Sequence, residues 1–226
     1  MPATKNNVYG SCFGWTALVL LFVSLVVPWY TWTYGYSFDG ESCTWRIVFF
    51  WAHVVCTPSG ACGSESCPEP VVAFWTENQD NHFAAVYAPT LFLMLFATIF
   101  ALVATLFFSV RCCCMRAGSS TSSALTTAVC LLGALGLVLL TLAIVVFAAT
   151  APLGWDHGHG NLHLPGPWDS FIGTQTLENE GSKLELTWAP VGWWFALVAW
   201  PFFLATTIAL FFAFKARERG YSLINN

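Results

Sequence analysis

The sequence predicts an all-α membrane four-helix bundle that carries a small extracellular antiparallel β-sheet. The chain is 57% hydrophobic and only 9% charged, whereas soluble globular chains carry about 25% charged residues. Four uncharged apolar stretches are each long enough to cross a hydrocarbon core, which requires about 20 helical residues. The first long loop between them is rich in β-branched and aromatic residues, which favour strands.

The four predicted helices belong to a single four-transmembrane domain, 1–226, and span residues 13–32, 83–110, 124–149 and 191–214. None contains Asp, Glu, Lys, Arg or His, and helices satisfy the backbone hydrogen bonds that lipid cannot provide. The first is expected to be retained rather than cleaved as a signal peptide, because it continues into an aromatic belt at Trp29–Trp32. Small residues predict close helix packing; they are Ala97, Ala101, Thr105, Gly133 and Gly136.

The distribution of charge predicts the orientation of the bundle. The two ends of the chain and the loop 111–123 carry six of the eight Lys and Arg residues, whereas the loops 33–82 and 150–190 carry eleven of the 12 acidic residues. Basic loops remain in the cytoplasm. We therefore expect both termini and loop 111–123 to be cytoplasmic, the loops 33–82 and 150–190 to lie outside, and the plasma membrane to be the location.

Alternating residues in the two outer loops predict strands. In the first outer loop we expect one strand around Tyr34–Phe38, a turn at Asp39-Gly40, a strand or strand pair over Cys43–Val55, and another strand over Val71–Trp75. Lys183–Trp188 alternates as well and is expected to add a strand to the same sheet. The result is an antiparallel sheet of three to five strands.

Four cysteines lie in the first outer loop, namely Cys43, Cys56, Cys62 and Cys67. The loop is expected to face an oxidising compartment, where cysteines pair as disulfides. Four cysteines allow three pairings, and the sequence does not choose among them. A structural role is the main interpretation, because crosslinks stabilise a sheet with little core; thiol–disulfide exchange with a partner is the alternative.

Cysteines and histidines elsewhere suggest two further sites. Cys112, Cys113 and Cys114 follow the second predicted helix beside basic residues at a cytoplasmic membrane edge, which predicts S-palmitoylation, with unmodified thiols as the alternative. His157, His159 and His163 lie in the second outer loop, and His nitrogen atoms bind Zn²⁺ or Cu²⁺. Because glycines separate them and no cysteine helps, we expect no metal centre, and these three residues are only a weak candidate.

A short motif in the first outer loop resembles the claudin, peripheral myelin protein and amastin superfamily. Phe49-Phe50-Trp51 is followed by Cys56 and then Cys67, and Trp29 follows Pro28 at the end of the first span. The superfamily has a Gly-Leu-Trp motif and two cysteines in the same loop of four-transmembrane proteins. Here Phe-Phe replaces Gly-Leu, and Cys43 and Cys62 are additional.

The resemblance implies a fold, a disulfide pattern and a role. It implies that Cys56 pairs with Cys67, which leaves Cys43 for Cys62, and that Trp29, Phe49, Phe50 and Trp51 are signature residues. It also implies a claudin-like, non-enzymatic role in cell adhesion, cell junctions or membrane assembly. In this role the outer sheet contacts other copies of the chain or another membrane protein.

Two other functions remain as alternatives. One is an accessory subunit of a larger membrane channel or receptor complex. The other is a membrane thiol oxidoreductase, which is disfavoured because no Cys-x-x-Cys pair lies in the outer loops and residues 150–190 contain no cysteine. The small net charge of −4 indicates no nucleic-acid partner, so the lipid bilayer and a membrane protein are the expected partners, and no cofactor is expected.

Overall fold

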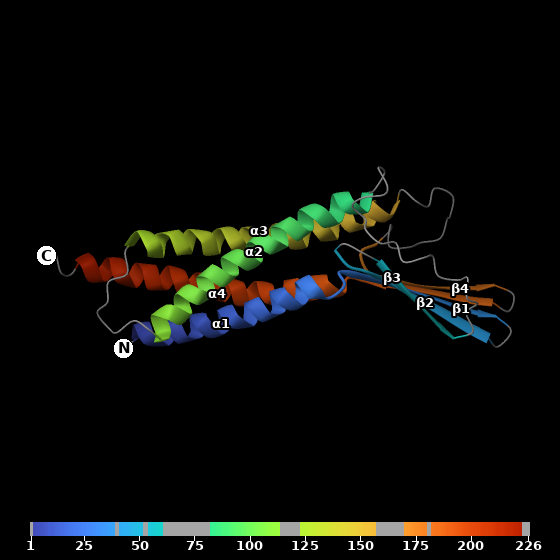
Figure 1. Cartoon of the computed structure of the whole chain (residues 1–226), viewed down its shortest axis with the longest axis horizontal. Coiled ribbons are helices and arrows are strands. Elements are labelled where there is room, and N and C mark those ends of the chain that lie inside the picture. The colour runs from blue at the N-terminus through green and yellow to red at the C-terminus, as the bar shows by residue number, and fades with distance from the viewer. Residues whose placement is uncertain are drawn as a thin grey trace. The chain divides into compact units, whose positions relative to one another are not determined.

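The structure is a computed structural model, and it describes residues 2–38, 41–51, 54–60, 82–113, 123–156, 170–179 and 182–222. The helices are α1 (Pro2–Val26), α2 (His82–Cys113), α3 (Ser123–Asp156) and α4 (Val191–Ser222). The strands are β1 (Tyr30–Phe38), β2 (Glu41–Phe49), β3 (Val54–Gly60), β4 (Gly173–Asn179) and β5 (Ser182–Ala189). Figure 1 shows these elements coloured in chain order.

The chain divides into two compact units. The helix unit comprises Met1–Val23, Phe92–Ala143 and Phe195–Asn226, and the sheet unit comprises Ser24–Leu91 and Ile144–Trp194. The sequence predicts one domain, and all four points of division fall inside helices, one in each, so each of the four helices contributes residues to both units.

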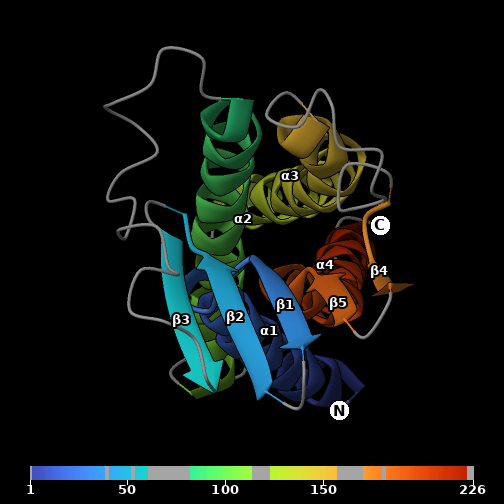
Figure 2. The same cartoon turned by 90° about the vertical axis from the view of Figure 1, so that its right-hand side faces the viewer.

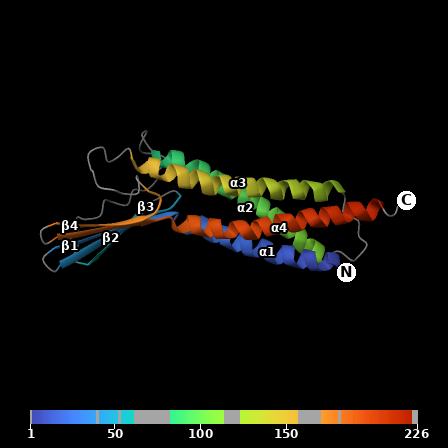
Figure 3. The same ribbon diagram turned by 180° about the vertical axis from the view of Figure 1, so that it is seen from behind.

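All four helices are long and apolar enough to cross a membrane. The apolar segments are Val8–Val26, Ala85–Val110, Ala124–Pro152 and Val191–Phe212, so the prediction of four spans is confirmed by length and composition. Within the helix unit, α1 begins and α4 ends at the same end, as Figures 1 and 3 show. An even number of antiparallel helices produces this arrangement.

The predicted end of the first helix at Trp32 is wrong. α1 ends at Val26, and β1 has begun by Tyr30. Pro28 explains the change, because proline lacks an N–H and disfavours the helical conformation in the residue before it. Hydropathy does not detect this boundary, since the strand that follows is as aromatic as the helix. The predicted start of the second outer loop at residue 150 is also wrong, because α3 continues through Pro152 to Asp156.

Small residues allow the helices of the helix unit to pack closely. Ala97, Ala101 and Thr105, the predicted small-residue row of α2, are all buried. A Cβ atom added to Gly136 of α3 would lie 2.8 Å from Phe100 Cβ and 2.9 Å from Phe203 Cζ. Because this distance is shorter than van der Waals contact, a larger residue at position 136 would push apart the helices that carry these phenylalanines.

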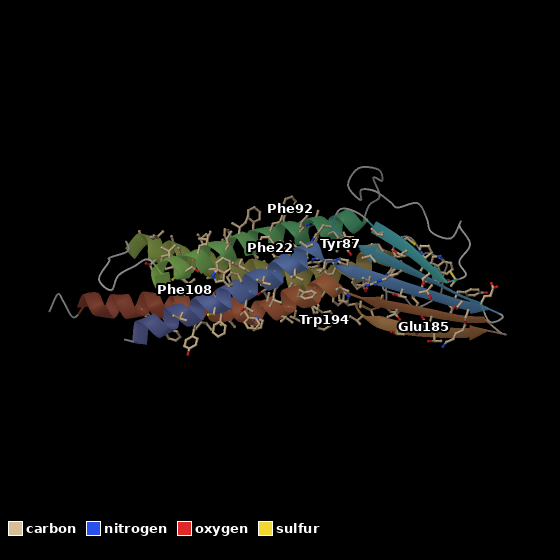
Figure 4. The ribbon with its side chains drawn as sticks, turned by 60° about the horizontal axis from the view of Figure 1, so that its bottom comes forward. Phe22, Tyr87, Phe92, Phe108, Glu185 and Trp194 are labelled. Carbon is tan, nitrogen blue, oxygen red and sulfur yellow. The ribbon has the colours of Figure 1, made fainter. Side chains whose placement is uncertain are left out.

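The outward side chains of the helix unit are mostly apolar. Phe22 and Phe92 are 57% and 59% exposed, whereas Phe108 is fully buried; all three are labelled in Figure 4. A helix with apolar residues on both its inner and outer sides is typical of a membrane span, because lipid rather than water surrounds it.

The sheet is antiparallel and has five strands in the order β3-β2-β1-β5-β4. Figure 2 shows this order from the end of the sheet. The central strand β1 pairs with β2 on one side and with β5 on the other. The sheet therefore joins strands from the first and second predicted outer loops. The strands of one loop lie more than a hundred residues from those of the other in the chain.

The predicted sheet of three to five antiparallel strands is confirmed. The Cys43–Val55 run forms parts of two strands, β2 and β3, and the alternating run Lys183–Trp188 lies within β5. The sequence interpretation missed β4. The predicted strand Val71–Trp75 and the turn Asp39-Gly40 lie outside the described residues.

Candidate functional site

The five-stranded sheet has two chemically different faces, because successive side chains of a strand point to opposite sides. The strand register places mostly aromatic and aliphatic residues on one face, which we call the aromatic face; they include Tyr30, Trp32, Tyr34, Tyr36, Cys43, Trp45, Ile47, Phe49, Leu184, Leu186 and Trp188. The opposite polar face carries mainly hydroxyl and charged residues; they include Thr33, Gly35, Ser37, Ser42, Thr44, Arg46, Lys183, Glu185 and Thr187.

Part of the aromatic face is accessible. Tyr34 and Tyr36 on the central strand are 36% and 40% exposed, and Trp45 on β2 lies with its ring centroid 5.3 Å from that of Tyr34. Between the row of Tyr36 and the row of Tyr30, the described strands place no charged side chain on this face. The aromatic face therefore offers rings and aliphatic groups without charge.

Two tryptophans anchor the sheet unit at the end of α1. Trp29 is fully buried, and its ring centroid lies 4.3 Å from that of Trp51. The Trp29 indole N–H donates to the Ser24 carbonyl at 2.7 Å, and the Trp51 indole N–H donates to the Leu25 carbonyl at 3.0 Å. The last four carbonyls of a helix have no partner within it. The two indoles therefore cap two of the free carbonyls of α1.

Further rings enclose the two tryptophans. Phe147 of α3 meets Trp29 edge-on with 4.8 Å between ring centroids, and Tyr87 of α2 meets Trp51 at 6.1 Å. Edge-to-face pairs at such distances contribute about 0.5–1.5 kcal/mol beyond the burial of their area. This cluster joins residues from α2 and α3 to the segment between α1 and β1.

Gly192 at the start of α4 lies against the same cluster. Its N–H donates to the Pro28 carbonyl at 2.9 Å, and its carbonyl accepts a hydrogen bond from the Ser24 hydroxyl at 2.9 Å. A Cβ at position 192 would lie 2.7 Å from Cδ1 of Trp29. The backbone of α4 thus approaches Trp29 so closely that only glycine fits without a shift.

The structure places the signature residues predicted by the resemblance around this cluster. Trp29 and Trp51 are in contact. Phe49 is buried, packs edge-on against Trp32 at 5.4 Å, and accepts a main-chain hydrogen bond from Trp29 N–H at 2.9 Å. Phe50 is half-buried in the segment between β2 and β3.

Sequence reasoning missed a second aromatic group that holds the start of β1. The Tyr30 hydroxyl donates to the Phe171 carbonyl at 2.7 Å, and the Trp188 indole donates to the Ser170 carbonyl at 2.9 Å. Burial raises the pKa of the Tyr30 hydroxyl well above its ordinary value. The alternating run that ends at Trp188 is the one sequence signal that points to this group.

Cys43 and Cys56 both belong to the aromatic face, and no disulfide joins two cysteines of the described residues. In the register of β2 and β3, Cys43 is opposite Gly60 and Cys56 is opposite Ile47. Four residues of strand separate the two cysteines, about 13 Å, and a disulfide requires Cα atoms within about 7 Å. Of the three possible pairings, the one that joins Cys43 to Cys56 is therefore excluded.

The other predicted site residues lie at the edge of the described chain or outside it. Cys62, Cys67, Cys114, His157, His159 and His163 are outside the described residues. Cys112 and Cys113 form the last two residues of α2, and only their backbone is described. No group of metal-binding side chains occurs among the described residues, and the free thiols described are Cys12 and Cys130.

No protein-family model and no curated protein matches the chain. The claudin-like resemblance therefore stays a prediction.

Proposed function

We propose that the chain is a non-enzymatic integral membrane protein that assembles with a second copy of itself through the aromatic face of its sheet. The observation that carries this proposal is the exposure of Tyr34 and Tyr36 on an uncharged face. Tyr and Trp are enriched at protein interfaces, where their rings bury much area at little cost in side-chain entropy. A sheet face that is exposed to water usually carries charged side chains instead.

Between the rows of Tyr36 and Tyr30 the described strands place no charged side chain on the aromatic face, and Glu41 lies one row beyond Tyr36. This uncharged area favours a copy of the same chain as the partner. In a two-fold symmetric contact the same surface meets itself. A charged face would then place like charges against each other, which costs several kcal/mol. The aromatic face avoids this repulsion, whereas the polar face carries Arg46, Lys183 and Glu185.

The membrane orientation is part of the same proposal. The basic residues at the ends of the chain and in the loop 111–123 support a cytoplasmic location for both termini. Both strand-bearing segments then leave the membrane on the outer side, because each connects an outward-running helix to an inward-running one. A sheet outside the plasma membrane is available for cell adhesion or a cell junction, in keeping with the claudin-like resemblance.

Disulfides are proposed to hold this surface together. With Cys43 and Cys56 on the aromatic face, we favour the pairs Cys56–Cys67 and Cys43–Cys62, which the resemblance implies. Each crosslink would contribute about 2–4 kcal/mol to the stability of the outer segment. Acylation of Cys112, Cys113 and Cys114 is a separate prediction for the cytoplasmic end of α2.

Photo-crosslinking from one strand tests the proposed surface. A p-benzoylphenylalanine residue replaces Tyr36, and the matched control replaces Ser37, the next residue of β1, which belongs to the polar face. In membranes we expect irradiation to yield covalent dimers of the chain from position 36 and few from position 37. Equal dimer yields from both positions would contradict the proposal. An adduct of position 36 with a larger unrelated protein would favour the accessory-subunit alternative.

A further inference from the structure

Gly35 occupies the middle of the central strand, where a glycine is unexpected. Glycine in a strand interior weakens the strand and often marks a bulge, a bend or a close approach by a ligand. The pairing of β1 is unbroken on both sides of Gly35, opposite Thr44 and Glu185, so there is no bulge. Among the described glycines only Gly60 has a positive φ, so backbone conformation does not require glycine at position 35 either.

Packing does not require glycine at this position. A Cβ added to Gly35 would have its nearest neighbours at 3.7 Å, the Glu185 carbonyl oxygen, and at 3.9 Å, the Thr44 hydroxyl oxygen. These are ordinary van der Waals distances. Gly192 differs, because its missing Cβ would collide with Trp29. A ligand that approaches the polar face would account for Gly35.

The missing side chain leaves a shallow hollow of about 150 Å³ on the polar face. This volume is roughly ten times the minimum needed for one water molecule. Gly35 lines it together with five residues of the polar face, namely Ser37, Ser42, Thr44, Lys183 and Glu185. Tyr36 and Cys43 also line the hollow, and their main chain does so because their side chains belong to the aromatic face.

The chemistry of the hollow suits a neutral ligand with many hydroxyl groups. Lys183 provides donors and Glu185 provides acceptors, about 7 Å apart on the same face of β5; Glu185 is labelled in Figure 4. Ser37, Ser42 and Thr44 add three hydroxyl groups to the lining, and a hydroxyl can both donate and accept. The Ser37 hydroxyl also donates to the Lys183 carbonyl, at 3.5 Å. The opposite charges cancel, so neither an anion nor a cation is favoured by the net charge of the site.

We propose that this hollow binds one hexose unit of a neutral glycan. A protein side chain is a less suitable occupant, because protein interfaces concentrate their binding energy in aromatic residues and Arg, and the aromatic residues of this sheet lie on the other face. The polar face offers no ring on which a sugar can stack. Binding of a single hexose therefore rests on hydrogen bonds and is expected to be weak, with a dissociation constant on the order of 1 mM.

Saturation-transfer NMR with methyl β-D-glucopyranoside and methyl β-D-galactopyranoside tests the site. The full chain is studied in lipid nanodiscs, so that no sugar-based detergent competes. Gly35→Val fills the hollow with a residue that favours strands. The matched control Thr33→Val changes the same strand and face two residues away, outside the hollow. Near-UV circular dichroism checks that both variants keep the tertiary packing of the parent protein.

The expected result is transfer to at least one hexoside in the parent protein and in Thr33→Val, and about tenfold weaker binding in Gly35→Val. Equal binding by Gly35→Val and the parent protein, or no transfer to either hexoside, would overturn the proposal. Binding of the zwitterion glycine in place of the hexosides would overturn it too. Dimer formation through the aromatic face is unaffected by Gly35→Val, so this result is independent of the assembly proposal.

Discussion

Removal of the Trp29 indole N–H tests whether the tryptophan cap stabilises the last turn of α1, which belongs to the sheet unit. Trp29→Phe keeps an aromatic ring in the cluster but leaves the buried Ser24 carbonyl without its 2.7 Å hydrogen bond. An orphaned buried acceptor costs about 1–3 kcal/mol. Trp29→Ala also removes the ring that contacts Trp51 and Phe147, and the resulting cavity raises the expected loss to about 3–5 kcal/mol.

The control for this prediction is Trp15→Phe. Trp15 also donates an indole hydrogen bond, to the Ser109 hydroxyl at 3.1 Å, but its side chain is 46% exposed. Its loss is expected to cost less than about 0.5 kcal/mol. Equilibrium unfolding by sodium dodecyl sulfate in mixed micelles, followed by near-UV circular dichroism, measures the three variants. A Trp29→Phe loss no larger than that of Trp15→Phe would refute the capping argument.

Three further predictions concern the same sheet unit. Gly192→Ala forces a Cβ to within 2.7 Å of the buried Trp29 ring, so the same titration should show a loss of about 1–3 kcal/mol; an unchanged midpoint would contradict the close packing. Because burial raises the folded-state pKa of Tyr30 above its unfolded value, the stability it contributes is complete below about pH 10 and falls as the pH rises further. Unfolding by sodium dodecyl sulfate at about pH 8 and pH 11 should therefore show a smaller fall in the free energy of unfolding for Tyr30→Phe than for the parent protein. Equal falls in the two proteins would contradict this prediction. Mass spectrometry of non-reduced peptides should find no link between Cys43 and Cys56, because the strand register holds them about 13 Å apart; such a link would show that the register is wrong.

The helices could be predicted from the sequence because lipid imposes a simple requirement on length and polarity. Each predicted range except the first lies within an observed helix. The error at Trp32 shows what hydropathy lacks. Pro28 ends the helix, but the strand after it is also rich in Trp and Tyr side chains. Tyr30 is buried by other parts of the sheet unit, whereas Tyr34 and Tyr36 are exposed on the aromatic face.

The sheet was predictable only where the sequence alternates strongly. β5 alternates in Lys183–Trp188 and was found, whereas β4 is short and begins at a glycine that packs against the Trp188 ring. The pairing Asn179 with Ser182 leaves only two residues between β4 and β5. Glycine at the second of these, Gly181, is a hairpin signal that would have located β4.

The two-faced character of the sheet required the strand register. Individual strands indicate an alternation, but only the pairing of β1 with both β2 and β5 brings the aromatic residues of three strands to one side. The cap formed by Trp29 and Trp51 also depends on tertiary contacts. The family resemblance suggested both tryptophans as signature residues, but it did not indicate that their indole N–H groups donate hydrogen bonds to the end of α1.

The central claim is that copies of the chain meet through the aromatic face. Cryo-electron microscopy of the protein extracted in a mild detergent without reductant tests this claim most directly. The account predicts like subunits in contact through Tyr34 and Tyr36, with Gly35 and the polar face left open. A single copy packed against a different, larger protein, or copies that touch only through their helices, would contradict it.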